Sequence, residues 1–195
     1  MNRLLLILIL IFSFQSWTKA DDISDFEIEG MSIGDSLLDY YSKEEIKKYT
    51  TENYYKVDKF IVVDFFLPSF ETYDSVQINY KKNDNKYKIY AIGGDIFYEN
   101  NIEECYKKKD EIINQISEIL INFNKTDFGP LKQSYDTIGE SYVTGTNFEN
   151  KTDGTIHVAC YDWSEEIKKA QNIWDYFRLG IATKEFEIFI NTVAY

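Results

Sequence analysis

The chain has 195 residues, a formal net charge of −12 at pH 7 and a hydrophobic share of 44%. That share is typical of a globular protein and excludes a disordered chain. The negative charge argues against nucleic-acid and anionic-lipid partners, because both repel an acidic protein.

The first twenty residues have the pattern of a secretory leader. Arg3 is followed by an apolar run, Leu4 to Phe12, which is too short for a membrane span of roughly 20 apolar residues. Thr18 and Ala20 place small residues at the −3 and −1 positions of a cleavage site. We predict a signal peptide over 1–20, removed after Ala20. The alternative is an uncleaved anchor.

The predicted mature chain is one domain, 21–195, with no membrane span. Asp21 follows the cleavage site where a lipoprotein would carry Cys. Loss of the leader lowers the basic residues from 21 to 19 against 33 acidic ones, a net charge of −14. We expect this product to be periplasmic or secreted.

Two serines near the start are each followed three residues later by an acid, Ser32 by Asp35 and Ser42 by Glu45. This spacing is that of a capping box, in which side chains bond the free amides of a helix start. We therefore predict one helix from Ser32 and a second over Lys43 to Lys48, without any catalytic role for the serines.

Runs of β-branched and aromatic residues predict the first strands, over 56–68 and then over 74–84 and 86–98 as a hairpin. Asn83, Asp84 and Asn85 supply its turn. The pair Gly93 and Gly94 interrupts the third run, and we expect a bulge or bend there.

Helical periodicity then predicts a long amphipathic helix over 102–122. A loop is expected over 124–140, followed by two strands over 141–150 and 155–163 and by a short helix capped by Asp162 or Ser164. A further strand is expected over 175–183. The last residues fit either a helix or a strand, and we favour a helix capped by Thr183.

These elements predict an α+β fold. Short turns between successive strands indicate an antiparallel sheet of about five to six strands. One long amphipathic helix covers it, with short helices at the N-terminus and a helix at the C-terminus.

The two cysteines lie on apolar faces of predicted elements. Cys105 is on the inward stripe of the long helix, and Cys160 alternates with Ile156 and Val158 on one strand face. An exported protein with an even number of cysteines commonly forms disulfides. We predict a Cys105–Cys160 bridge, worth about 4 kcal/mol in the chain-entropy model; two buried free thiols are the alternative.

Residues for catalysis are scarce. His157 is the only histidine, which argues against a His-based triad or a multi-histidine metal site. Adjacent acids such as Glu103 and Glu104 suit the first turn of a helix. We therefore assign no catalytic, cofactor or metal residues, and expect no cofactor.

Aromatic residues offer a recognition surface instead. Tyrosine combines an apolar ring with a polar hydroxyl and is enriched at binding surfaces. Among the 16 tyrosines, Tyr40 and Tyr41, with Tyr161 beside Trp163, form a candidate binding surface for a protein or glycan. The alternative is that these rings fill half-buried sheet positions.

The stretches "FEIEGMSIGDSLLDYYSKEEI" and "CYDW" resemble those of a family of small exported proteins of AT-rich marine bacteria. The resemblance covers most of the mature chain and both cysteines, and implies export without an assigned activity. A weaker similarity is to the SmpA/OmlA outer-membrane assembly lipoproteins. This chain lacks their lipidated Cys, so no residue roles are carried over.

The leading hypothesis is a non-catalytic module that binds an envelope protein or glycan. One alternative is a carboxylate-based hydrolase of glycan or peptidoglycan, which needs two acids facing each other across a cleft. Another is a small-ligand carrier, which needs a cavity with convergent tyrosine hydroxyls.

Overall fold

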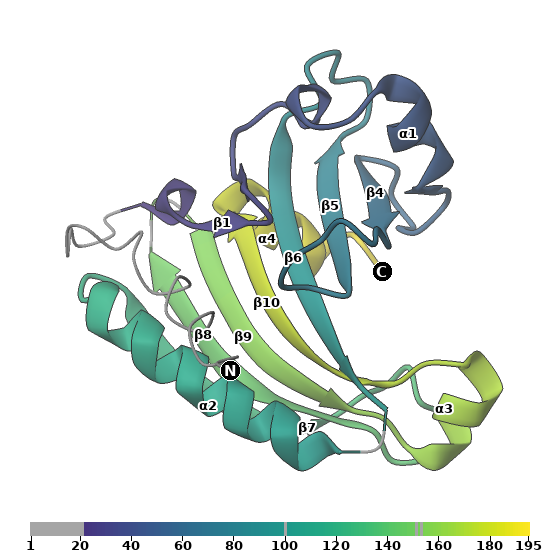
Figure 1. The fold of residues 1–195 in the computed structure, drawn as a ribbon, viewed down its shortest axis with the longest axis vertical. Helices are drawn as coiled ribbons and strands as arrows, with labels where there is room; N and C mark the ends of the chain where they lie inside the picture. Colours follow the sequence, from purple (N-terminus) through teal and green to yellow (C-terminus); the bar gives the residue numbers. More distant parts are fainter. Residues whose placement is uncertain (1–21, 100, 151, 153) are drawn as a thin grey trace, which may run out of the picture.

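The computed structural model describes residues 22–99, 101–150, 152 and 154–195, so the predicted leader lies outside the described residues. Over these residues the chain forms an eight-stranded antiparallel sheet in the order β3-β4-β5-β6-β10-β9-β8-β7, and a small two-stranded sheet, β1-β2 (Figure 1). The strands are β1 Glu27–Ile28, β2 Met31–Ser32, β3 Thr50–Thr51, β4 Phe60–Phe65, β5 Ser75–Lys81, β6 Ile89–Tyr98, β7 Asn124–Lys132, β8 Tyr142–Asn150, β9 Gly154–Asp162 and β10 Asp175–Thr183. The helices are η1 Ile23–Asp25, η2 Leu37–Asp39, α1 Lys43–Lys48, α2 Ile102–Ile119, α3 Glu165–Gln171 and α4 Lys184–Thr192.

The predicted α+β class, the antiparallel pairing and the C-terminal helix are confirmed. Thr183 caps α4 by accepting a hydrogen bond from the amide of Phe186, as expected. The sheet is larger than the five to six strands predicted, because β3 and β7 join its two edges. β3 spans two residues, too few to leave a periodic pattern in the sequence.

The loop predicted over 124–140 is wrong for its first half. β7 pairs with β8 along most of its length, with a register shift between Phe128 and Leu131. As an edge strand it buries neither face, so its residues do not alternate in hydrophobicity. An edge strand also tolerates Pro130, which can donate no ladder hydrogen bond.

The helix predicted from Ser32 is also wrong. Asp35 does accept a hydrogen bond from the Ser32 amide at 2.9 Å, which is half of a capping box. The chain nevertheless turns at Gly34, whose φ is +97°, a left-handed value that ends any helical run. The 3₁₀ turn η2 starts later, with Ser36 as its cap. The second box, Ser42 with Glu45, caps α1 as predicted.

The bulge expected at Gly93 and Gly94 is absent, because the described ladder continues through both residues to β5 and β10. The register of β6 shifts instead opposite Asn79 and Tyr80. Gly94 makes room for a side chain, because a Cβ there would lie 2.5 Å from the ring of Tyr73.

The sheet has two differently covered faces. Helix α2 crosses one face, over β9 and β10, and α4 lies behind the other (Figure 1). The main core fills the α2 face; Phe65, Phe148 and Phe177 are among its fully buried side chains. A smaller core lies under α4, where Phe186 and Phe189 pack on Phe60 and Val62. Among the residues described, no other helix crosses that face (Figure 1).

A disulfide joins Cys105 of α2 to Cys160 of β9, with the two Cα atoms 6.0 Å apart. It ties the long helix to the middle of the sheet, and both residues are fully buried. Disulfides persist in oxidising compartments, so the bridge indicates an extracytoplasmic location. Among the residues described, no helix is long and apolar enough to cross a membrane.

Candidate functional site

A row of polar side chains crosses the α4 face of the sheet. Six neighbouring strands from β4 to β8 contribute one residue each, and all six point away from α2, because they alternate with the residues that pack under it. We call this set the polar row: Asp64, Gln77, Asp95, Arg178, His157 and Asn147.

Arg178 and Asp95 form the centre of the polar row. Nε and Nη2 of Arg178 each donate to one oxygen of Asp95 at 2.7 Å, a bidentate pair. The Asp95 side chain is 8% exposed and that of Arg178 is 22% exposed. Burial opposes the charge on Arg178, but Asp95 outweighs it and raises the pKa of the guanidinium well above its usual value.

The side chain of Arg178 lies beside Gly93. A Cβ on Gly93 would lie 3.6 Å from Nε of Arg178, an ordinary van der Waals contact. Its remaining nitrogen, Nη1, is 3.5 Å from Oε1 of Gln77. Gln77 in turn donates to Asp64 at 2.7 Å, which extends the network to β4. The arginine is thereby held in one orientation.

His157 occupies the other half of the polar row. Its Nδ1 is 2.8 Å from Oδ1 of Asn147, and its Nε2 is 3.5 Å from the hydroxyl of Tyr161. Phe128 stacks on the imidazole. Burial, with a smaller contribution from Arg178, lowers the pKa of His157 to about 4, so the ring is neutral at pH 7. It is an uncharged hydrogen-bonding group there.

A hollow of about 280 Å³ lies over the polar row, between the sheet and α4. Arg178, His157, Gln77 and Asn147 line it, and Gly93 and Gly180 form part of its floor. Its other polar lining residues are Asn79, Glu149, Thr155, Glu187 and Asn191. Side-chain amides and both signs of charge therefore surround the space.

A continuous row of aromatic rings borders the polar row on the same face. Neighbouring rings have centroids 4.5 to 6.5 Å apart. We call it the aromatic row: Phe66, Phe97, Trp174, Tyr176, Tyr161, Trp163 and Tyr135. The two rows meet at Arg178, whose guanidinium carbon is 5.5 Å from the centre of the Tyr176 ring.

Two buried carboxylates hold one end of the aromatic row in place. Asp175 accepts hydrogen bonds from the amide of Trp163 and from Nζ of Lys168, both at 2.7 Å. Asp136, next to Tyr135, accepts from the hydroxyls of Ser141 and Ser164 at 2.6 and 2.5 Å. Burial alone would raise the pKa of Asp136, but these hydrogen bonds and those of two amides lower it to about 2.

The structure separates the residues that the sequence proposed as one binding surface. Tyr161 and Trp163 lie together in the aromatic row, with rings 6.1 Å apart. Tyr41 instead stacks on Phe65, on the α2 side of the sheet. Tyr40 bonds through its hydroxyl to Asp35 and to the carbonyl of Gly30. Tyr40 and Tyr41 thus belong to the N-terminal packing and not to this face.

Sequence reasoning missed the centre of the site, Arg178 with Asp95. A signal was present, since Arg178 is the only arginine after residue 20 in a chain otherwise rich in lysine. A lysine cannot replace the two-pronged contact of arginine with a carboxylate. The partner was hidden, because Asp95 is 83 residues away along the chain.

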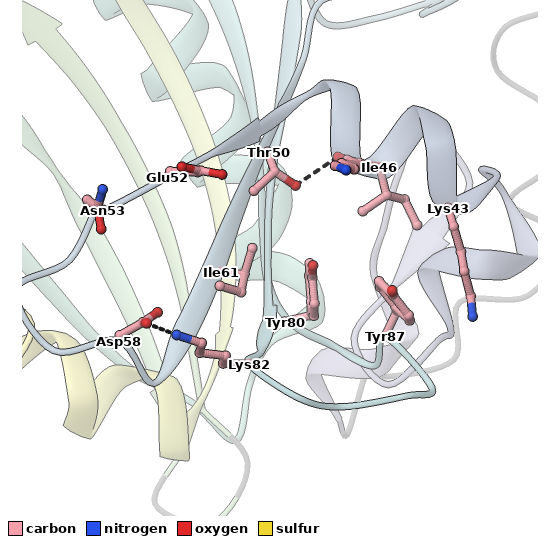
Figure 2. Close-up of a pocket in the computed structure, with 11 residues that line it drawn as sticks. Lys43, Ile46, Thr50, Glu52, Asn53, Asp58, Ile61, Tyr80, Lys82 and Tyr87 are labelled. Carbon is pink, nitrogen blue, oxygen red and sulfur yellow. Dashed lines mark hydrogen bonds and ion pairs between the residues drawn. The ribbon is translucent and has the colours of Figure 1, made fainter.

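A second hollow, of about 530 Å³, lies between α1 and the edge of the sheet (Figure 2). Tyr80 and Tyr87 stand side by side in it, with ring centroids 4.9 Å apart. Lys82 at its rim is paired with Asp58, and Lys43 lies over the ring of Tyr87. Its charged side chains are exposed and none is held by a buried partner, so it is a weaker candidate.

No group of three or more His, Cys, Asp or Glu side chains among the described residues could hold a metal ion. No family model matches this chain, and no curated protein or solved structure matches it. The functional argument therefore depends on the two rows of the α4 face.

Proposed function

We propose that this protein is an exported, non-catalytic binding module of the cell envelope, periplasmic or secreted, and that its ligand lies on the α4 face. The observation that carries the proposal is Arg178, which lines the hollow while a bidentate pair with Asp95 holds it, beside a row of aromatic rings of which three are exposed. The leader pattern and the disulfide support export. The resemblance to small exported bacterial proteins agrees with this location.

Stability alone gives little reason for the pair. Removing two charges from water costs several kcal/mol per ion, and apolar residues of similar size often stabilise as well or better. A pair that lies where the sheet face is open is better explained by recognition. Arg178 lines the hollow and offers a ligand N–H donors in a fixed orientation.

The aromatic row supports the same conclusion. Phe66 is 59% exposed, Trp174 40% and Tyr135 60%, although all three are large rings. Exposed apolar side chains that form a continuous patch usually mark an interaction site. Asp175 and Asp136 hold one end of this patch in place, which supports its role as a binding surface.

The hydrolase alternative has less support. Its acids would have to face each other freely in the hollow, one of them as a proton donor. The acids that line the hollow are Glu149 and Glu187, whereas Asp95, which is occupied by Arg178, and Asp64, which accepts from Gln77 and Thr51, do not line it. Glu187 accepts from Thr155 and pairs with Lys184. One of the two acids of the hollow is therefore already engaged, which argues against a pair of free acids.

A sedimentation assay with bacterial envelope fragments tests the proposal. The native protein should sediment with the fragments, and Trp174→Ser should weaken this about tenfold. The matched control is Ile121→Ser, which removes a similarly exposed apolar side chain just after α2. Equal sedimentation of native protein and Trp174→Ser, or no sedimentation at all, would refute the proposed binding face.

A further inference from the structure

We infer that the ligand is an uncharged carbohydrate chain, with sugar rings lying on the aromatic row and one sugar unit reaching from it into the hollow over the polar row. This inference rests on the proposed function and adds the chemical class of the ligand. Charge, hydrogen-bonding capacity and the shape of the face each support it.

The charges around the hollow favour a neutral ligand. Arg178 is matched by Asp95, so the centre of the site has no net charge to offer. Glu149 and Glu187 also line the hollow, and the whole chain has a net charge of −12. An anionic ligand would be repelled by these groups. A cationic ligand would have to approach the guanidinium of Arg178.

The polar groups suit hydroxyls. A sugar hydroxyl both donates and accepts hydrogen bonds, and a side-chain amide presents one group of each kind. Gln77, Asn79, Asn147 and Asn191 place four amides around the hollow, next to the Arg178–Asp95 pair. Gln77 already bonds Asp64 and Arg178, Asn79 bonds Tyr55, and Asn147 bonds His157. A sugar hydroxyl can add hydrogen bonds to these amides, whereas a purely apolar ligand can add none.

The aromatic row suits the apolar face of a sugar ring. One face of a sugar ring presents mainly C–H groups, which pack on aromatic rings, while tyrosine hydroxyls remain free to bond at the edge. The row continues from Phe66 to Tyr135, well beyond the hollow itself. Such an extended platform fits several linked rings and not a single small molecule.

The size of the hollow agrees with a ligand that places one sugar unit there and its other rings on the aromatic row. Sites for whole small-molecule ligands have about 300 to 1,000 Å³. The hollow here has about 280 Å³, so it holds one small unit of a longer ligand.

Trp163 provides independent support for a hydroxyl-bearing ligand on the aromatic row. Its indole Nε1 is buried and donates to no atom of the part of the chain that the structure describes. A buried N–H without an acceptor is costly, so such groups are rare in folded proteins. A ligand hydroxyl on the aromatic row beside Trp163 would supply the missing acceptor after a small shift of the indole.

Affinity electrophoresis of the native, disulfide-bonded protein tests the inference. The probes are pairs with one backbone each: hydroxyethyl cellulose against carboxymethyl cellulose, and dextran against dextran sulfate. At least one neutral member should retard the protein, and its charged counterpart should bind at least tenfold more weakly. Trp174→Ala should weaken retardation about tenfold, as should Arg178→Lys.

Two further variants guard against misfolding. Asn147→Ala keeps the Arg178–Asp95 pair and should still weaken binding several-fold, whereas Tyr40→Phe, outside the face, should bind like the native protein. Retardation by the charged members as strong as by the neutral ones would overturn the inference. So would no retardation by any neutral member while envelope fragments still bind through Trp174, and in that case the proposed binding face would stand with another ligand class.

Discussion

Arg178 of β10 and Asp95 of β6 lie directly opposite each other in the middle of the sheet and share two hydrogen bonds of 2.7 Å. The pair is the meeting point of the polar row and the aromatic row. Most of its surface is removed from water, yet the Arg178 side chain remains 22% exposed. The open side of the guanidinium is therefore available to a ligand, while its position is fixed by Asp95.

The coupling between the two residues can be measured with a double-mutant cycle. Asp95→Leu should lower the free energy of unfolding by about 3 to 5 kcal/mol, because it leaves a buried charge unpaired, and Arg178→Met should do the same. The double variant should lose much less than the sum of the two losses. Urea unfolding measures all four proteins, and additive losses would show that the pair is not coupled.

His157 predicts a loss of stability in mild acid. Its folded pKa of about 4 lies below the ordinary 6.5, so its contribution is present above pH 6.5 and is lost as the pH falls toward 4. Burial, with a smaller contribution from Arg178 of β10, keeps the imidazole neutral at pH 7; Asn147 of β8 and Tyr161 of β9 face its two nitrogens. Unfolding free energy should fall by about 2 to 3 kcal/mol between pH 7 and pH 4.

The variant His157→Asn should remove that step from the pH profile measured by urea unfolding. Asp136 supplies an internal control in the same variant. Its folded pKa of about 2 lies below its ordinary value of 3.8, so its contribution is lost only as the pH falls from about 4 to 2. A native-like step between pH 7 and 4 in the variant would assign the acid loss to another group.

The two adjacent glycines of β6 should respond differently to one added methyl group. In Gly94→Ala the new Cβ would lie 2.5 Å from the ring of Tyr73, so the strand or the ring must shift, at about 1 to 3 kcal/mol. In Gly93→Ala the nearest atom is 3.6 Å away, an ordinary contact, and stability should be unchanged or up to about 1 kcal/mol higher. Thermal unfolding of both variants measures this difference; no loss of stability in Gly94→Ala would mean that the ring of Tyr73 yields freely.

The disulfide should contribute about 2 to 4 kcal/mol to stability, because it closes a loop across 55 residues of the chain. The double variant Cys105→Ser, Cys160→Ser should show that loss in urea unfolding. A reducing agent should shift the native protein to the variant's midpoint and leave the variant unchanged. No shift on reduction would mean that the bridge adds no stability.

The sequence predicted the parts of the fold that have strong local signals. The stripe of α2, the capping box at Ser42 and the inward position of both cysteines arise from neighbouring residues, and the structure has them all. The exposed edge strand β7 has no such signal, since neither of its faces is buried. The spacing of Ser32 and Asp35 produced one capping bond without a helix, because Gly34 turns the chain.

The site was only partly predictable for a similar reason. Tyr161 and Trp163 lie two residues apart in the sequence, and this nearness was enough to predict that they share a surface. The rest depends on pairing between distant strands, which places Asp95 beside Arg178 and Asn147 beside His157. Tyr40 and Tyr41 looked equivalent to Tyr161 in the sequence, and only the fold shows that they lie elsewhere.

Hydroxyl-radical footprinting of the native protein, with and without envelope fragments, tests the binding face most directly, because it presumes no ligand class. Phe66, Trp174 and Tyr135 are exposed in the free protein and should each become protected, while Tyr40 and Ile121 should be oxidised equally in both samples. Protection of Tyr40 or Ile121 with unchanged oxidation of Trp174 and Tyr135 would show that the α4 face is not where this protein binds.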